Sequence, residues 1–131
     1  MAMTMMGTGI RVSDLDRSTA FYRDVLGMVE SGRFEFPGMT EVLLKCTDVP
    51  EEGAIILVAQ AADTSPIEIG TGFGRFAFFV PDARAVRRQL LDAGFEADDP
   101  VEFDGGVATI VFGTDPDGYR LEFIQVGQAG S

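Results

Sequence analysis

Short stretches in which apolar and polar residues alternate recur along the chain and predict β-strands. The stretches lie at 8–13, 28–34, 39–45 and 54–59, and again at 73–80, 96–103, 107–113 and 119–126. Between the first and second stretch of each group, at 14–26 and 82–93, the apolar residues follow a helical spacing instead. Each half of the chain therefore predicts the order βαβββ.

The ends of both predicted helices carry residues that favour a helix boundary. Ser13 or Asp14 precedes the first helix and Asp82 precedes the second, and such side chains accept hydrogen bonds from the first free backbone N–H groups. Gly27 and Gly94 follow the helices, where a left-handed backbone costs a glycine little. Local chemistry thus delimits both helices at both ends.

The two halves correspond to each other at a constant offset. Gly27 corresponds to Gly94 and Val42 corresponds to Thr109, each 67 residues further on. An offset that is kept across a helix end and a later strand indicates an internal duplication. The predicted modules are 7–60 and 73–126, joined by 61–72. Each module alone is too small for an independent core, so the two sheets must close on each other or on a partner chain.

The composition narrows the possible partners and chemistry. The chain has 10 Lys and Arg against 21 Asp and Glu, a formal net charge of -11 at pH 7, which disfavours nucleic acid as a partner. Histidine is absent, which excludes His-based catalysis and imidazole metal ligands. Cys46 is the single cysteine, so a disulfide framework is excluded and an ordinary free thiol is expected.

No segment of the sequence predicts a membrane protein or an exported one. No apolar run is long enough for a membrane helix, and the start lacks the features of a signal peptide. We therefore expect a cytoplasmic protein without a membrane partner. The strong preference for Arg over Lys is compatible with a bacterial origin.

Two local stretches resemble one protein family. The first is 10–18, with the sequence IRVSDLDRS, and the second is 115–123, with the sequence DPDGYRLEF. With the duplicated βαβββ order, they are similar to the glyoxalase I, bleomycin-resistance and extradiol-dioxygenase superfamily, also called vicinal oxygen chelate proteins. The resemblance implies an α+β fold in which two tandem βαβββ modules form a cupped mixed sheet, with the helices outside the cup. It also implies a single domain over 1–131, a small-molecule ligand and a homodimer.

Metal-binding members of this family hold a divalent cation with four side chains, and the resemblance assigns those positions to four residues here. The four are Gly7, Ile56, Arg75 and Glu122. Glu122 alone keeps a ligand type, whereas a catalytic zinc-type site needs about three protein ligands. Arg75 brings a permanent positive charge to a ligand position. We therefore expect no metal and no other cofactor, and an ion pair between Arg75 and Glu122.

Strand alternation predicts which other side chains face the cup of the implied fold. With Glu122 as the candidate catalytic residue, the expected ligand-binding residues are Arg11, Arg75, Ile56, Val58, Ala77, Phe79 and Arg120. The resemblance implies that Arg11 can hold a ligand carboxylate, and a surface or inter-module salt bridge is the alternative. The crowding of phenylalanines in 73–80 also predicts that both faces of this strand are buried.

Three functions remain open on these grounds. The main prediction is a small-molecule binding protein that has lost the metal site and sequesters a drug or metabolite, with the acidity favouring a cationic ligand. The first alternative is a metal-independent isomerase, epimerase or lyase, in which Glu122 abstracts a proton next to a carbonyl and Arg75 or Arg11 stabilises the enolate-like charge. The second alternative is a glyoxalase-type lyase or a dioxygenase-like metalloenzyme, against which the missing ligands argue.

Overall fold

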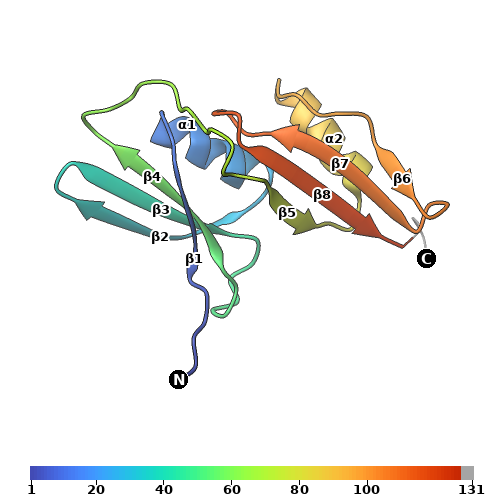
Figure 1. The fold of residues 1–131 in the computed structure, drawn as a ribbon, viewed down its shortest axis with the longest axis horizontal. Coiled ribbons are helices and arrows are strands. Elements are labelled where there is room, and N and C mark those ends of the chain that lie inside the picture. The colour runs from blue at the N-terminus through green and yellow to red at the C-terminus, as the bar shows by residue number, and fades with distance from the viewer. Residues whose placement is uncertain (128–131) are drawn as a thin grey trace. The chain divides into compact units, whose positions relative to one another are not determined.

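A computed structural model describes residues 1–127 of the chain. The chain divides into two compact units, Met1–Glu68 and Ile69–Ser131. Each unit builds one four-stranded mixed sheet and carries its own helix (Figure 1). Among the described residues, every helix lacks the length and apolar character that crossing a membrane requires.

The first unit follows the order predicted for the first half. Its elements are β1 (Gly7–Arg11), α1 (Leu15–Ala20), the π-helix η1 (Phe21–Val25), β2 (Val29–Phe36), β3 (Met39–Lys45) and β4 (Ala54–Gln60). The sheet order is β1-β4-β3-β2, in which β1 runs parallel to β4 and the other neighbours are antiparallel. The first and last strands of the unit are therefore side by side, with the helix as the connection between β1 and β2.

The second unit repeats this topology. Its elements are β5 (Phe76–Phe79), α2 (Ala83–Asp92), β6 (Val101–Phe103), β7 (Ala108–Thr114) and β8 (Arg120–Val126). The sheet order is β5-β8-β7-β6, again with one parallel pair, β5 and β8, and otherwise antiparallel neighbours. The predicted α+β fold class, with a βαβββ order in each half, is confirmed.

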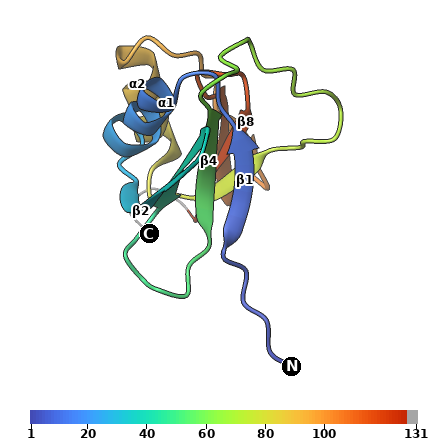
Figure 2. The same cartoon turned by 90° about the vertical axis from the view of Figure 1, so that its left-hand side faces the viewer.

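In each unit the helix packs on one face of its own sheet (Figure 2). Val42 and Leu57 in the first unit and Val111 and Leu121 in the second are fully buried. Because successive side chains of a strand point to opposite faces, the residues between these positions form a second face that the unit's own helix does not cover. We call these two surfaces the open faces. The first includes Gly7, Gly9, Arg11, Ile56 and Val58, and the second includes Ala77, Phe79, Arg120, Glu122 and Ile124.

The helix boundaries rest on the capping residues that the sequence indicates. The Asp14 side chain accepts a hydrogen bond from the Arg17 backbone N–H at 3.1 Å, and Asp82 accepts one from Ala85 at 3.0 Å. Each cap satisfies a backbone donor that has no partner inside the helix. Gly94 ends the second helix with a φ of 87°, a conformation that favours glycine.

The first helix differs from the regular helix expected over 14–26. After Ala20 it widens into the π-helix η1, and the Leu26 N–H donates to the Phe21 carbonyl at 3.1 Å. The rings of Phe21 and Tyr22 are both buried and meet edge to face, with their centres 5.0 Å apart. The wider turn accompanies the burial of two adjacent aromatic rings, which a spacing of 3.6 residues does not place on one face.

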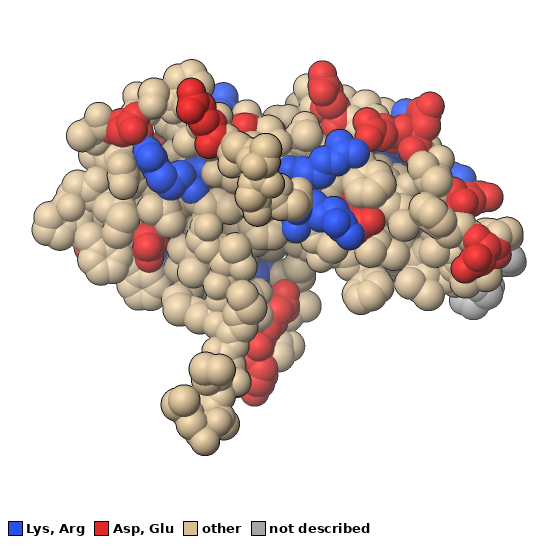
Figure 3. All heavy atoms as spheres, in the orientation of Figure 1, with Lys and Arg blue, Asp and Glu red and all other residues tan. Residues whose placement is uncertain are grey.

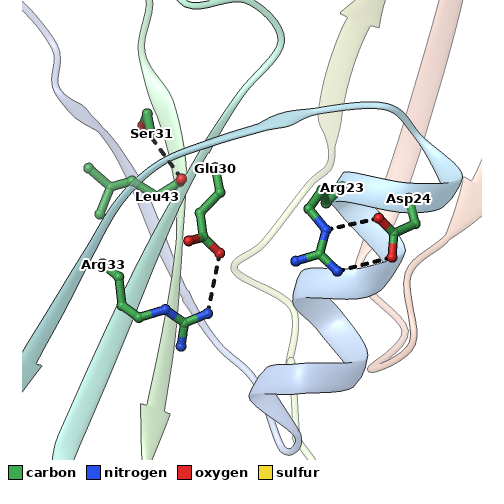
Figure 4. Close-up of polar contacts among 6 residues, drawn as sticks. All are labelled: Arg23, Asp24, Glu30, Ser31, Arg33 and Leu43. Atoms are coloured by element: carbon green, nitrogen blue, oxygen red, sulfur yellow. Dashed lines mark hydrogen bonds and ion pairs between the residues drawn. The ribbon is translucent and has the colours of Figure 1, made fainter.

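A β-bulge interrupts the pairing of β2 with β3. Glu30 lies opposite Leu44 and Gly32 lies opposite Leu43, so Ser31 is an extra residue in β2. Its hydroxyl donates to the Leu43 carbonyl at 3.5 Å (Figure 4). Because of this extra residue, the alternation of β2 side chains between the two faces of the sheet shifts by one position at Ser31.

Three predictions for the second half are wrong. The stretch 96–103 forms a strand only over Val101–Phe103, and the stretch 73–80 only over Phe76–Phe79. The burial of both faces of β5 is also contradicted, because Phe79 is 82% exposed. As an edge strand, β5 packs one side against its unit, where Phe78 stacks on Phe123 at 5.5 Å, and its alternate residues point away.

Candidate functional site

The open face of the second unit holds a buried carboxylate. Leu121 and Phe123 are buried toward the helix, so Glu122 between them points to the open face. Arg75 Nε donates to Glu122 Oε1 at 2.8 Å. The Glu122 side chain is only 8% exposed and that of Arg75 is 53% exposed. Burying a charge is costly unless it is paired, so the expected ion pair is present and Arg75 compensates the charge of Glu122.

The surroundings of Glu122 combine apolar groups with a second guanidinium. Ala77 of β5 and Phe112 of β7 lie opposite it in the sheet. Arg120, two residues earlier in β8, lies with its guanidinium carbon 4.7 Å from the centre of the Phe112 ring. Its NH2 group is 3.2 Å from Asp98 Oδ2. Glu122 thus lies beside the Phe112 ring, and the Arg120 guanidinium lies over that ring. This arrangement keeps water away from one side of the carboxylate.

The open face of the first unit is apolar around Arg11. This residue ends β1 and lies opposite Val58 of β4, and both Ile56 and Val58 are half-buried. Arg11 NH2 is 3.3 Å from Asp63 Oδ2, in the segment that follows β4. The side chains of Arg11 and Asp63 are 43% and 45% exposed. Arg11 therefore makes the surface salt bridge that was the alternative to ligand binding, and the ligand-binding role stays a prediction.

A local turn holds Asp63 in place. Its Oδ1 accepts hydrogen bonds from the Ser65 backbone N–H at 3.1 Å and from the Ser65 hydroxyl at 2.5 Å. These bonds, the Ser65 hydroxyl first, and the Arg11 guanidinium hold the pKa of Asp63 below its ordinary value. Sequence reasoning missed Asp63, although the spacing of Asp63 and Ser65 is typical of a turn closed by an aspartate side chain.

The residues at the family's metal-ligand positions do not fit a divalent metal ion. Gly7 has no donor, and a Cβ built there would lie 2.2 Å from the Ala54 carbonyl oxygen, so the backbone leaves no room for a side chain. Ile56 is apolar, and the guanidinium of Arg75 is bound to the carboxylate of Glu122. Within residues 1–127, no group of three His, Cys, Asp or Glu side chains is arranged to hold a metal. A single carboxylate next to a fixed cation is not a metal site.

The predicted site residues fall into two sets, one on each open face. The first unit carries Arg11, Ile56 and Val58, and the second carries Arg75, Ala77, Phe79, Arg120 and Glu122. All three predicted arginines have a carboxylate oxygen within 3.3 Å. Figure 3 shows the same relation on the face in view, where acidic side chains are spread widely and basic ones lie beside them. A ligand anion therefore has to compete with the carboxylates of the chain itself for these cations.

Two hollows in the surface lie apart from these residues. One, of about 640 Å³, lies between the start of α1 and the end of β4, and includes Asp16, Arg17, Thr40 and Gln60. The other, of about 250 Å³, includes Arg84, Glu102, Thr109 and Gln125. Neither contains a residue predicted to bind ligand or to catalyse.

Comparison of the sequence with known proteins identifies relatives over nearly the whole chain. Residues 4–123 match the family described as Glyoxalase/Bleomycin resistance protein/Dioxygenase superfamily. A probable lactoylglutathione lyase of Synechocystis sp. is 34% identical over 125 residues, which cover 94% of this chain and 95% of the relative. The lactoylglutathione lyase of Salmonella typhimurium is 34% identical over 130 residues, which cover 98% and 96%.

Solved structures agree with these relatives. Glyoxalase I from Zea mays superposes with a TM-score of 0.85 and 31% identity, over 95% of this chain and 45% of the maize chain. The trypanothione-dependent glyoxalase I of Leishmania major superposes with a TM-score of 0.82 and 28% identity, over 95% and 87%. This chain thus spans less than half of the maize protein and most of the Leishmania protein.

These relatives contradict the main prediction of a binding protein without chemistry, because the relatives at 34% identity are named as lyases. That prediction relied on the missing metal ligands and on the acidity of the chain. Neither separates binding from catalysis, since a buried carboxylate beside a guanidinium offers acid–base chemistry by itself. The second alternative, a glyoxalase-type lyase, agrees better with the relatives. The family match and the identity over almost the full length show that this chain belongs to the glyoxalase, bleomycin-resistance and dioxygenase superfamily.

Proposed function

We propose that this protein is an enzyme of the lactoylglutathione lyase type, which interconverts a 2-hydroxyacyl thioester with a thiol and a 2-oxoaldehyde. In the thioester, the carbon next to the carbonyl carries a hydrogen and a hydroxyl group. Loss of that proton gives an enediolate, and return of a proton to the former carbonyl carbon gives a hemithioacetal, which is an isomer of the thioester. The hemithioacetal then separates into the thiol and the aldehyde. The relatives support this reaction class.

The observation that carries the proposal on this chain is the buried carboxylate of Glu122. Arg75 engages Oε1, which leaves Oε2 to take up the proton from the substrate carbon. A base sheltered from water, with its side chain 8% exposed, suits this transfer. The Arg75 guanidinium, fixed 2.8 Å from the base, stabilises the negative charge that develops on the enediolate oxygen.

The remaining predicted residues have binding roles in this proposal. Arg11 pairs with a carboxylate of the thiol part of the substrate. On each open face, apolar side chains contact apolar parts of the substrate, and Arg120 supplies a further cation on the open face of Glu122. The apolar residues are Ile56, Val58, Ala77 and Phe79. No step passes through a metal ion or another cofactor, because three of the four family ligand positions here have no side-chain atom that can bind a metal.

The assembly also belongs to the proposal. We infer one working domain over 1–131 and a homodimer in the cytoplasm. Support for the dimer comes from the sheets, since each ends in edge strands with exposed apolar side chains such as Phe36 and Phe79. Light scattering is expected to give twice the chain mass, and the chain mass at every concentration would contradict a dimer.

The enzymatic function is tested with chelator-treated protein, methylglyoxal and glutathione, by following the thioester that forms. We expect turnover to persist without added metal. Glu122→Gln keeps the shape of the side chain and its hydrogen bond to Arg75, but removes the base, so kcat should fall by about a hundredfold or more. Glu102→Gln is the matched control, because Glu102 is an exposed glutamate of the same unit paired with Arg84 at 3.0 Å.

Two outcomes would contradict the proposal. One is a folded wild-type protein that neither forms the thioester from methylglyoxal and glutathione nor consumes the thioester in the reverse direction. The other is a Glu122→Gln variant that turns over as fast as the Glu102→Gln control.

A further inference from the structure

The smaller hollow of the second unit contains polar groups that the rest of the chain leaves without partners. It has a volume of about 250 Å³ and lies between the start of α2, the end of β8 and the turn that joins β6 to β7 (Figure 1). We propose that this hollow is a binding site for a small monocarboxylate anion, whose oxygens are bound by Thr109 and Gln125. The site is separate from the one proposed for catalysis and does not depend on it.

Thr109 and Gln125 line the hollow from neighbouring strands. They lie directly opposite each other in β7 and β8, on the side of the buried Val111 and Phe123 and therefore on the helix side of the sheet, away from Glu122. Thr109 is 4% exposed and Gln125 is 6% exposed. Opposed side chains of antiparallel strands have Cβ atoms about 4.5–5.5 Å apart, so one small ligand can contact both.

The helix fixes the orientation of the Gln125 amide. Gln125 Oε1 accepts a hydrogen bond from the Ala83 backbone N–H at 2.9 Å, at the start of α2. Because a backbone N–H only donates, the amide oxygen faces the helix and the NH2 group is left for another partner. Among residues 1–127, this NH2 group has no acceptor and the Thr109 hydroxyl has no hydrogen-bond partner. Two polar groups of buried residues thus need a partner from outside, because leaving them unpaired costs free energy.

Both groups are accessible from the hollow. In the part of the chain that the structure describes, Thr19 Oγ1 is the one side-chain polar atom that is fully enclosed and also without a partner. The unpaired groups of Thr109 and Gln125 are therefore open to the hollow that they line. Since one water takes up about 30 Å³ in the liquid, the hollow has room for a ligand of several non-hydrogen atoms.

The groups around the hollow favour an anion with two acceptor atoms. The Gln125 NH2 group offers two hydrogens and the Thr109 hydroxyl offers one, and the positive end of the α2 dipole lies beside them. Arg84 at the rim donates from NH2 to Glu102 at 3.0 Å and has further N–H groups for the ligand. The two oxygens of a carboxylate can accept from both strands at once. A phosphate dianion would bring a second negative charge close to Glu102, in a chain whose net charge is -11.

The test follows the backbone amide signals of isotope-labelled wild-type protein by NMR during titration with sodium acetate, acetamide or sodium phosphate at constant ionic strength. Acetate is expected to shift the signals of Arg84, Gly105 and Gly127, which line the hollow, in a saturable way. The Kd should lie in the millimolar range, because acetate has few atoms. Acetamide has the shape of acetate without its charge and should bind at least about fivefold more weakly. Phosphate should also bind more weakly than acetate.

Two variants test the assigned residues. Gln125→Glu keeps an oxygen for the Ala83 N–H but replaces the NH2 group with a negative oxygen, so acetate should bind about tenfold more weakly or less. Thr109→Val keeps the shape of the side chain without the hydroxyl and should weaken acetate binding by about fivefold. Gln89→Glu is the matched control, because it adds the same charge at an exposed position of α2, and the Kd should change by less than about twofold.

Four results would overturn the inference. Folded wild-type protein whose amide signals do not respond to acetate would show that the hollow holds water only. Acetamide that binds as tightly as acetate would show a site for neutral ligands, and phosphate that binds more tightly would show a phosphate site. Acetate binding to Gln125→Glu that equals binding to the Gln89→Glu control would place acetate elsewhere, and if Gln125→Glu does not fold, wild-type affinity in Thr109→Val has the same meaning. The proposed catalysis at Glu122 is unaffected by each of these results.

Discussion

The two open faces belong to repeats of one topology but carry different chemistry. In each unit an edge strand, β1 or β5, runs parallel to the last strand, β4 or β8. At equivalent positions of the last strands, β4 has Ile56 and β8 has Glu122. Near the start of the edge strands, the first unit has Gly7 and the second has Arg75. The first face is thus apolar around Arg11 and closely packed at the backbone, while the second keeps a buried carboxylate paired with a half-exposed arginine.

The first unit shows that the βαβββ framework does not require a buried charge. Both units bury a similar apolar set beneath the helix, such as Leu57 in one and Leu121 in the other. Pairing with the half-exposed Arg75 allows the carboxylate of Glu122 to leave water, and replacing a buried ion pair with apolar residues is often neutral or favourable for stability. A pair kept at that cost in only one of two equivalent places favours a chemical role over a structural one.

The largest expected effect comes from removing one member of that pair. Arg75→Met leaves Glu122 buried without its partner, and we expect the free energy of unfolding in urea to fall by about 3 kcal/mol, the lower end for a broken buried pair because Arg75 is half exposed. Arg75→Met/Glu122→Leu should return to within about 1 kcal/mol of the wild type but have no activity.

Arg120→Met is the control for this experiment. Its partner Asp98 is exposed, so the loss should stay below about 1 kcal/mol. Equal stability of the Arg75→Met variant and the wild type would mean that the burial of Glu122 carries no cost. The difference between the two open faces would then be no argument for a chemical role of the pair.

A smaller effect is expected from the close backbone approach on the first open face. A Cβ at Gly7 would lie 2.2 Å from the Ala54 carbonyl oxygen, whereas at Gly9 its nearest neighbour is Val58 Cγ2 at 3.7 Å. Gly7→Ala should therefore lower the free energy of unfolding by about 2 kcal/mol, because backbone atoms must move. Gly9→Ala on the same strand should change it by no more than about 0.5 kcal/mol. Similar decreases in the free energy of unfolding for both variants would show that the backbone of β1 can move to make room for a Cβ at Gly7.

The smallest effect concerns Glu52, a carboxylate of the first unit that is not part of the open face. Glu52 accepts hydrogen bonds from the Cys46 backbone N–H at 2.8 Å and from Thr47. Cys46 is exposed at the surface, but partial desolvation of its thiol first, and then the charge of Glu52, raise the pKa of the thiol to about 11. Cys46 should therefore react slowly with iodoacetamide at pH 8, since the thiolate is the reactive form.

Glu52→Gln removes the smaller of these two causes. It should speed the alkylation of Cys46 by about threefold, with the remaining desolvation keeping the thiol less reactive than in the unfolded chain. Glu51→Gln, one residue earlier, is the control and should leave the rate unchanged. A slower reaction in Glu52→Gln would contradict the assigned direction of the charge effect.

Much of the fold and part of the site follow from local sequence signals. Alternation predicts β3 with the bounds Met39–Lys45, and the caps at Asp14 and Asp82 are those observed. Alternation also places Glu122 on the face opposite its buried neighbours, whereas its ion pair with Arg75 was expected from the positions that the family resemblance assigned to both residues. The strand bounds, the helix caps and the face of Glu122 depend on residues close together in the chain or on a single strand's periodicity.

Contacts between distant segments decided the rest. The exposure of Phe79 follows from the edge position of β5, the crowding at Gly7 from the approach of β4, and the pairing of Arg11 from the path of the chain at Asp63. The sequence by itself determined the repeated βαβββ order and the face on which each strand residue lies, because backbone periodicity and capping are local. Only the tertiary structure decided which charges are buried, which are paired in water and where the backbone leaves no room for a side chain, because these depend on segments that meet only when the sheet has formed.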